Sequence, residues 1–165
     1  MTICQGPIIQ TAWVTFDAEE TERFLTNQIG AGGWTRIPDV HFGPDTCTYR
    51  GEPADFVAHV ALSYIGDMQL EVIQPVRGES IYTEFLTRAG GGLHHICFET
   101  AHIAEVEGEA AAQGIPVVQR GVMAGGAMTF AYLDGSAAAV PYIELAQIGP
   151  DMKSFFEHVK SQAAR

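Results

Sequence analysis

The feature that most limits the possible folds is an approximate internal repeat. Residues 10–15 (QTAWVT) align with residues 95–100 (HICFET), and residues 70–74 (LEVIQ) align with residues 143–147 (IELAQ). Identity between the two halves is low, so the match depends mainly on the repeated order of elements, which is strand, helix and further strands. Such a repeat predicts a fold built from two equivalent modules.

The first half is rich in predicted strands and contains one helix. Residues 7–16 carry many β-branched and aromatic side chains, which is typical of a strand. Asp17 is expected to cap a helix that ends at the glycines of 30–33. A hairpin turn at Gly66-Asp67 is expected to join the last two strands of this half. Those two strands cover 56–65 and 68–74, and two earlier ones cover 34–42 and 47–49.

The second half repeats this order after a connecting helix. The connecting helix is predicted at 80–88, where the apolar residues fall on one face. A second helix is expected at 102–113, and a glycine-containing loop is expected at 121–127. Asp151 is expected to cap a C-terminal helix. The predicted strands cover 93–100, 115–119, 128–133 and 140–147, and the C-terminal helix covers 152–163.

The repeat places polar side chains at matching positions of otherwise apolar strands. Gln10 aligns with His95 in the first strand of each half, and Glu71 aligns with Glu144 in the last strand of each half. A carboxylate in an apolar strand is costly to bury unless it is paired or binds a metal. The matched positions therefore predict four donors that converge on one metal site. The alternative is that these are four unrelated polar residues.

The predicted ligands favour particular metals and a particular chemistry. Two carboxylates, one imidazole and one amide oxygen suit Zn²⁺, Ni²⁺, Co²⁺, Mn²⁺ or Fe²⁺ better than an ion that prefers thiolates. A metal in such a site would polarise a substrate carbonyl while a base moves the neighbouring proton. Glu71 and Glu144 are both candidates for the catalytic base, since the symmetry of the repeat does not separate them.

Other side chains are candidates for the pocket around the metal. His59 lies on a predicted strand with alternating faces, and a structural histidine is the competing interpretation. Cys97 shares the predicted face of His95, although a small packing residue is the competing interpretation. Tyr142 shares the predicted face of Glu144, and His41 is a further candidate.

Composition excludes several classes of partner. The net charge of −11, with only nine Lys and Arg residues, argues against binding to nucleic acid or to an anionic membrane surface. The three cysteines have no disulfide or zinc-finger spacing and indicate reduced thiols. Neither a secretory signal nor an apolar run long enough to span a membrane is found. The expected protein is therefore cytoplasmic and acts on a small molecule.

These residues resemble the vicinal oxygen chelate superfamily, which includes glyoxalase I, methylmalonyl-CoA epimerases, extradiol dioxygenases and bleomycin-resistance proteins. Residues 92–96 (GLHHI) and 71–75 (EVIQP) are similar to segments of the epimerases, and in that pattern His95 is the ligand while His94 points away. The start at Gln10 is similar to eukaryotic glyoxalase I, whose ligands are Gln, Glu, His and Glu. Residues 49–54 (YRGEPA) resemble an uncharacterised bacterial glyoxalase-like branch.

The resemblance implies an α+β fold in which two βαβββ modules form a half-open barrel, followed by a C-terminal helix. The single glyoxalase-like domain of 1–165 would comprise a module at 7–75, a linker helix at 78–90, a module at 91–148 and a C-terminal helix at 151–163. The length and character of the linker favour a site within one chain, and pairing into a homodimer is expected.

The expected function is a metal-dependent isomerase, epimerase or lyase that transfers a proton next to a carbonyl. The epimerases usually have His where this chain has Gln10, so the ligand set departs from theirs. A metal-free protein that sequesters a drug or toxin is the alternative. A ring-cleaving dioxygenase is less well supported, because such enzymes use two histidines and one carboxylate for Fe(II).

Overall fold

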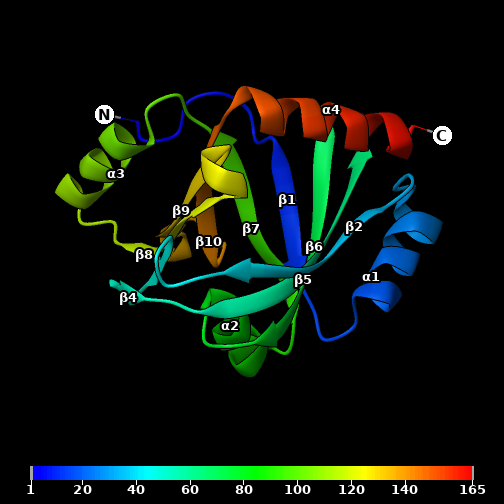
Figure 1. The fold of residues 1–165 in the computed structure, drawn as a ribbon, viewed down its shortest axis with the longest axis horizontal. Helices are drawn as coiled ribbons and strands as arrows, with labels where there is room; N and C mark the ends of the chain where they lie inside the picture. The colour runs from blue at the N-terminus through cyan, green and yellow to red at the C-terminus, as the bar shows by residue number, and fades with distance from the viewer. Residues whose placement is uncertain (1, 165) are drawn as a thin grey trace.

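Ten strands form one curled, mixed sheet in the computed structural model, which describes residues 2–164 (Figure 1). The strands are β1 (Gln10–Val14), β2 (Thr35–Phe42), β3 (Cys47–Tyr49), β4 (Glu52–Pro53), β5 (Phe56–Ile65), β6 (Met68–Arg77), β7 (Gly92–Glu99), β8 (Val117–Met123), β9 (Met128–Asp134) and β10 (Tyr142–Ile148). Their order across the sheet is β2-β5-β6-β1-β7-β10-β9-β8-β3-β4.

The sheet order contains the internal repeat. In the first module β1 pairs in parallel with β6, and β6 pairs antiparallel with β5. In the second module β7 pairs in parallel with β10, and β10 pairs antiparallel with β9. The two modules meet where β1 and β7 pair antiparallel at the centre of the sheet. The predicted fold of two βαβββ modules in a half-open barrel, with a C-terminal helix, is confirmed.

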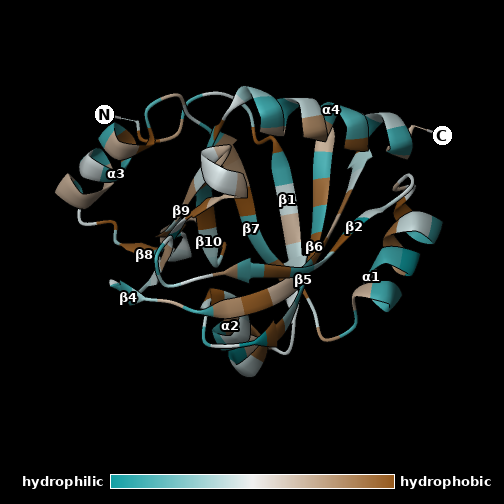
Figure 2. Ribbon diagram, in the orientation of Figure 1, coloured by the Kyte–Doolittle hydropathy of each residue, from teal (hydrophilic) through white to brown (hydrophobic). Residues whose placement is uncertain are grey.

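Within residues 2–164, four α-helices surround this sheet: α1 (Ala18–Phe24, continued by a π-helical turn at Leu25–Ile29), α2 (Ile81–Ala89), α3 (Ile103–Ala112) and α4 (Pro150–Ala163). The helix α1 packs on the first module and α3 on the second, while α4 lies across the sheet and α2 lies at the opposite end of the strands (Figure 1). Figure 2 shows mainly hydrophilic colouring on α1, in contrast to the hydrophobic stretches of β5. None of the helices in residues 2–164 is long and apolar enough to cross a membrane.

Equivalent helices cover the outer face of each module. Leu25 packs with Val72 of β6, and Ala110 of α3 packs with Leu145 of β10. These side chains alternate along their strands with residues that face inward, because successive side chains of a strand point to opposite faces. The inner, concave face of the sheet is therefore left for the interior of the barrel.

The connection between β2 and β3 explains why the sheet curls. These strands are consecutive in sequence, yet β2 is one edge of the sheet and β3 lies near the other. Five residue steps separate Phe42 from Cys47, and an extended chain covers at most about 18 Å in that length. The two edges must therefore approach each other, and the curled sheet encloses a cavity.

The predicted loop at 121–127 is wrong in its first part, because β8 continues to Met123. Gly121 is paired with Cys47 on one side and with Phe130 on the other. A Cβ atom at Gly121 would lie 2.4 Å from the Phe130 ring, so this glycine permits close packing inside the sheet. The prediction that Asp151 caps α4 is also wrong, since the helix begins at Pro150 after Gly149.

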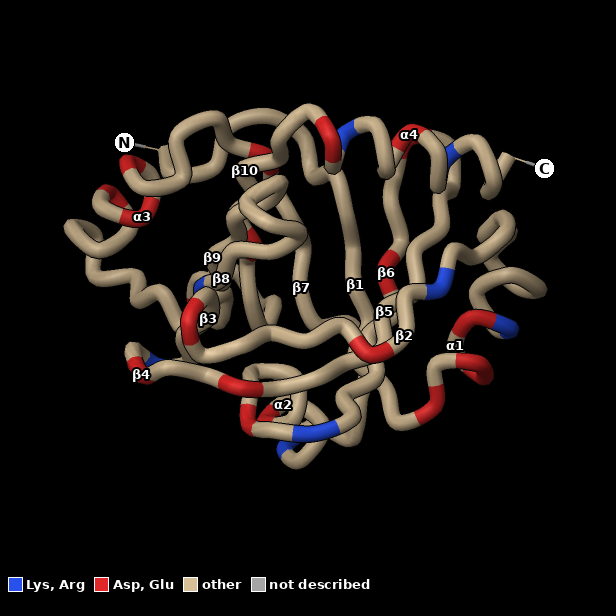
Figure 3. The backbone as a smooth tube through the Cα atoms, in the orientation of Figure 1, with Lys and Arg blue, Asp and Glu red and all other residues tan. Residues whose placement is uncertain are grey.

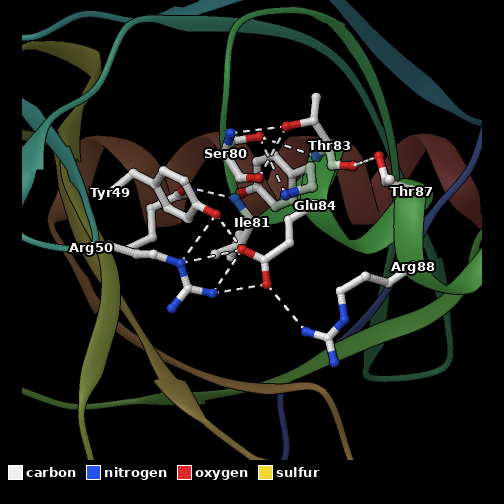
Figure 4. A network of polar contacts seen from close by, with 10 residues as sticks. Tyr49, Arg50, Ser80, Ile81, Thr83, Glu84, Thr87 and Arg88 are labelled. Atoms are coloured by element: carbon white, nitrogen blue, oxygen red, sulfur yellow. Dashed lines mark hydrogen bonds and ion pairs between the residues drawn. The ribbon is translucent and has the colours of Figure 1, made fainter.

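A capping box starts α2 and provides a test of local stability (Figure 4). The Ser80 hydroxyl accepts hydrogen bonds from the backbone N–H groups of Tyr82 and Thr83, and the Thr83 hydroxyl accepts one from the Ser80 N–H. Ser80→Ala is expected to lower the free energy of unfolding by about 1 kcal/mol, measured by urea denaturation. Thr87→Ala on the same helix is the matched control and should change it by less than about 0.5 kcal/mol. Equal effects would contradict the capping role.

Candidate metal centre

Strand register brings the predicted donors onto one face of the sheet. Ala12 of β1 lies opposite Glu71 of β6 on one side and opposite His95 of β7 on the other. All three belong to the inner face, where Ala12 and His95 are completely buried. The methyl group of Ala12 is small, so the two longer side chains can approach each other above it.

The other two donors, Gln10 of β1 and Glu144 of β10, are the register partners of Cys97 of β7 on its two sides. The repeat predicts this arrangement, because Cys97 aligns with Ala12 and is again a small residue between two polar ones. Four polar side chains therefore surround two small ones at the junction of the modules.

The four predicted side chains converge. Candidate ligand atoms of Glu71, His95 and Glu144 all lie within 4.8 Å of one another. The Nε2 atom of His95 is 3.0 Å from Glu144 Oε2, 3.4 Å from Glu71 Oε2 and 3.3 Å from the side-chain oxygen of Gln10. The donors thus come from four strands of both modules, while metal binding by them stays a prediction.

Gln69 orients the Gln10 amide and was not identified from the sequence. The Gln10 side-chain nitrogen donates to the side-chain oxygen of Gln69 at 2.6 Å, and the Gln69 nitrogen donates to the Tyr64 hydroxyl. With its nitrogen held in this way, Gln10 directs its oxygen toward His95. An oxygen is the atom that a divalent cation requires from an amide ligand. The pairing of Gln69 with Gln10 across β1 and β6 would have identified it, but the sequence alone does not give the register of these strands.

Charge and hydrogen bonding among these side chains change the pKa values of His95 and Glu71. Burial alone would lower the pKa of His95, but hydrogen bonds and charge from Glu144 and Glu71 raise it from 6.5 to about 9. Burial raises the pKa of Glu71, and His95 partly offsets this. Two largely buried carboxyl groups around a single imidazole would carry an excess of negative charge when both are ionised, and such charge is costly to bury. A divalent cation would neutralise that charge, so the donor set fits a metal ion.

A cavity of about 790 Å³ opens above the four donors. Gln10, Glu71 and Glu144 contribute to its wall, as do Tyr82 of α2 and Tyr132 of β9. The two tyrosine hydroxyls are 2.8 Å apart and are buried deep in the barrel. Sequence reasoning missed both tyrosines, because neither lies at a position that the repeat or a motif singles out. A volume of this size is typical of a small-molecule site.

The comparisons with known proteins agree with this architecture. The sequence profile of the Glyoxalase/Bleomycin resistance protein/Dioxygenase superfamily matches residues 9–132, which is most of the chain. The chain belongs to this superfamily. The search of curated proteins returned no match.

Solved structures with the same fold include epimerases. A hypothetical protein from Bacillus halodurans has 19% identity and a TM-score of 0.63, with 86% of this chain and 93% of that chain covered. Methylmalonyl-CoA epimerase from Mycobacterium tuberculosis has 14% identity and a TM-score of 0.63, covering 93% and 94%. A Streptomyces coelicolor methylmalonyl-CoA epimerase variant in complex with 2-nitronate-propionyl-CoA has 19% identity and a TM-score of 0.60, covering 87% and 95%. At these identities the likeness concerns the fold.

Three of the four additional pocket residues predicted from the sequence lie outside the cavity wall. His59 is outside the cavity wall, on the outer side of β5, where its Nδ1 accepts a hydrogen bond from the Asp39 N–H. Cys97 is buried beneath the donors as a packing residue, and burial raises the pKa of its thiol. Tyr142 packs behind the site, against His94. Of the four candidates, His41 alone lines the cavity.

The prediction that His94 points away from the site is wrong. Ala12 pairs with His95 and the next residue, Trp13, pairs with Leu93, so His94 is the extra residue of a β-bulge. The bulge directs both imidazoles inward, and both are completely buried. The two Nδ1 atoms lie 2.9 Å apart. Because burial and His95 hold the pKa of His94 well below its usual value, neutral His94 accepts a hydrogen bond from His95.

This contact predicts that His94 positions the ring of His95. His94→Phe keeps the ring volume but removes the acceptor, and loss of such an outer partner is expected to weaken Zn²⁺ binding about 10- to 100-fold. Isothermal titration with Zn²⁺ measures the change. Tyr142→Phe, which removes only a hydroxyl from a residue packed on His94, is the control and should bind Zn²⁺ as the parent does. Unchanged affinity in His94→Phe would exclude the positioning role.

Proposed function

We propose that the protein is a metal-dependent isomerase, epimerase or lyase that transfers a proton next to a carbonyl group. The observation that carries this proposal is the cluster of Glu71, His95 and Glu144, whose donor atoms lie within 4.8 Å at the wall of the cavity. Membership of the superfamily and the epimerase fold neighbours support the same class of reaction.

Gln10, Glu71, His95 and Glu144 would hold a divalent ion, for which Zn²⁺, Ni²⁺, Co²⁺, Mn²⁺ and Fe²⁺ are the candidates. When bound, such an ion supplies Lewis acidity to a substrate carbonyl oxygen and so makes the neighbouring C–H more acidic. The contribution of the protein is to fix the four donors before substrate arrives, since their strands belong to one sheet.

Glu71 is the better placed of the two candidate bases. Its side chain is 14% exposed, compared with 5% for Glu144, so it is more accessible from the cavity. Burial raises the pKa of Glu71, which brings its basicity closer to that needed for proton abstraction near neutral pH. Glu71 would take the proton from the carbon next to the carbonyl and return it to the same carbon or a neighbouring one.

Tyr82 and Tyr132 would bind the oxygen atoms of the substrate. Burial and the nearby glutamates raise the pKa of both phenols well above the usual value, so both hydroxyls stay protonated. Protonated phenols are hydrogen-bond donors, and donors aimed at a developing oxyanion stabilise the transition state. The part of the wall beside the carboxylates, where Tyr132 is the register partner of Glu144, therefore suits an enolate-like oxygen.

Proton exchange tests the proposal directly. A panel of carbonyl compounds with α-protons is incubated in D₂O with Zn²⁺-, Ni²⁺-, Co²⁺- and Mn²⁺-loaded protein, and loss of the α-proton signal is followed by NMR. Exchange should occur with at least one metal and fall at least ~100-fold in Glu71→Gln. Glu99→Gln, at an outer carboxylate of β7 paired with Lys153, is the matched control. Exchange that survives both metal removal and Glu71→Gln would overturn the proposal.

The second candidate is a metal-free protein that sequesters a ligand. The mostly apolar lining of the cavity is the observation that favours it, since an apolar cavity retains an apolar compound without chemistry. Absence of bound metal together with a co-purified compound would establish this alternative. Oxygen consumption with catechols and Fe(II) would instead establish a dioxygenase. Homodimer formation, to be measured by sedimentation, and a cytoplasmic location stay predictions.

A further inference from the structure

The cavity wall lacks cationic side chains. Four phenylalanines line it, two from the sheet (Phe42 and Phe130) and two from α4 (Phe155 and Phe156), together with several aliphatic and methionine side chains. No Lys or Arg belongs to the wall as far as residues 2–164 are concerned. A ligand with phosphate or carboxylate groups would find no partner of opposite charge on these side chains.

The charges that do line the cavity are negative. Besides Glu71 and Glu144, the wall includes Asp39 from β2 and Asp151 from α4. These two aspartates lie away from the four donors in sequence and on different elements, so the acidic character extends along the wall. Glu71 and Glu144 therefore disfavour an anionic ligand most strongly, while Asp39 and Asp151 act more weakly because their side chains are exposed to water.

Seven of the eight Lys and Arg residues in 2–164 form ion pairs with carboxylates, and the eighth, Arg23 of α1, is not part of the cavity wall. Figure 3 shows that blue positions are few, and several of them lie beside red ones. Arg50 and Arg88 both contact Glu84 on α2, outside the barrel (Figure 4). On α4, which walls the cavity, Lys153 pairs with Glu99 and Lys160 pairs with Asp67. The remaining described pairs are Arg36–Glu22, Arg77–Asp55 and Arg120–Glu107.

We infer that the substrate is an uncharged, largely apolar carbonyl compound, and that Phe155 and Phe156 of α4 form the part of the wall that selects it. This inference rests on the proposed function, because the carbonyl is the group that the metal centre would act on. The inference also predicts that coenzyme A thioesters are not substrates. The phosphate groups of the coenzyme carry several negative charges, which need Lys or Arg partners.

The place of α4 explains its role in selection. The helix lies across the sheet and packs on β5, and its inward side chains Met152, Phe155 and Phe156 complete the cavity. An apolar wall stabilises a ligand in proportion to the apolar area removed from water. Aromatic side chains add large, rigid surfaces suited to a planar or hydrocarbon ligand.

A matched pair of fluorescent probes tests the inference. N-phenyl-1-naphthylamine is neutral, and 8-anilino-1-naphthalenesulfonate has the same aromatic framework with one negative charge. We expect the neutral probe to bind at least about tenfold more tightly than the sulfonate, in both metal-free and Zn²⁺-loaded protein. We also expect propionyl-CoA to leave the neutral probe bound when added in large excess. Equal affinity for the two probes, or displacement by propionyl-CoA, would overturn the inference.

Variants locate the binding site of the neutral probe. Phe155→Ala and Phe156→Ala should each weaken its binding about tenfold, because each removes a large apolar surface from the cavity wall. Phe24→Ala, at an exposed phenylalanine of α1 that is outside the cavity, is the control and should bind as the parent does. If all three variants bind the probe equally, α4 does not select the ligand.

The outcome separates this inference from the proposed function. A protein that prefers the neutral probe but binds no metal and exchanges no proton would retain the apolar specificity and lose the proposed reaction. A protein that binds metal and exchanges protons but accepts propionyl-CoA would retain the reaction and lose the inferred substrate class. Circular dichroism of each variant confirms that a loss of probe binding does not come from unfolding.

Discussion

His95→Ala is expected to lower the affinity of the protein for Zn²⁺ by more than about 100-fold. Loss of a residue that only hydrogen-bonds to a metal ligand lowers affinity by about 10- to 100-fold, and His95 is itself a proposed ligand. His95 is the one nitrogen donor of the set, and its Nε2 lies between the oxygens of Glu71, Glu144 and Gln10. Its removal leaves two carboxylates and an amide around a wider space. Metal content after dialysis and isothermal titration with Zn²⁺, Ni²⁺ and Mn²⁺ measure the effect.

The matched control for that variant is His102→Ala. His102 is exposed at the start of α3, far from the site in the sheet, so its loss should leave the metal content unchanged. Glu144→Gln provides an independent check, because it removes charge while keeping the volume of the side chain. Stoichiometric metal in both His95→Ala and Glu144→Gln would show that the cluster is not a metal site.

The metal-free protein is expected to lose stability as the pH rises from about 6.5 to about 9. The pKa of His95 is raised from 6.5 to about 9 in the folded state, so its contribution to stability is complete below about pH 6.5 and disappears as the pH passes about 9. The difference corresponds to a loss of about 3 kcal/mol. The raised pKa of Glu71 acts in the same direction. A carboxyl group whose pKa is higher in the folded state than in the unfolded state also makes the folded state more stable at lower pH.

Urea denaturation at several pH values, with EDTA and then with saturating Zn²⁺, measures this prediction. Bound metal replaces the proton on the cluster, so the Zn²⁺-loaded protein should unfold at higher urea concentration and show a smaller pH dependence in this range. His95→Gln in the metal-free state should also flatten the curve, because the titrating group is gone. A metal-free parent protein whose stability is constant from pH 6.5 to 9 would contradict the coupling among these three residues.

Much of the donor set was predictable because strand periodicity is simple. Once Gln10 was aligned with His95 and Glu71 with Glu144, the alternation of side chains put all four on inward faces of their strands. The repeated topology then required the two modules to be related by an approximate twofold axis. Convergence of these side chains follows directly from that symmetry. In the structure the Nε2 atom of His95 lies 3.0 Å from Glu144 Oε2 and 3.3 Å from the side-chain oxygen of Gln10.

Errors arose where the chain departs from regular alternation. The bulge in β7 turned His94 inward, and the sequence contains no signal that would place the extra residue there. His59 shows a different limit, because alternation put it on one face of its strand without deciding between a cavity residue and a structural histidine. It lies on the outer side, where its Nδ1 accepts a hydrogen bond from the Asp39 N–H. Both the bulge and the choice of the inner face depend on pairing between strands that are distant in sequence.

The sequence by itself determined the modules, the family resemblance and which four polar side chains share the inner faces, because these follow from local periodicity and from the comparison of one half with the other. Only the tertiary structure decided the cavity and its lining. Tyr82, Tyr132, Phe155 and Phe156 come from a connecting helix, an inner strand and the C-terminal helix, and curling of the sheet brings them together. The absence of cations from the described wall is likewise a property of packing, since charge composition alone does not say which charges face inward.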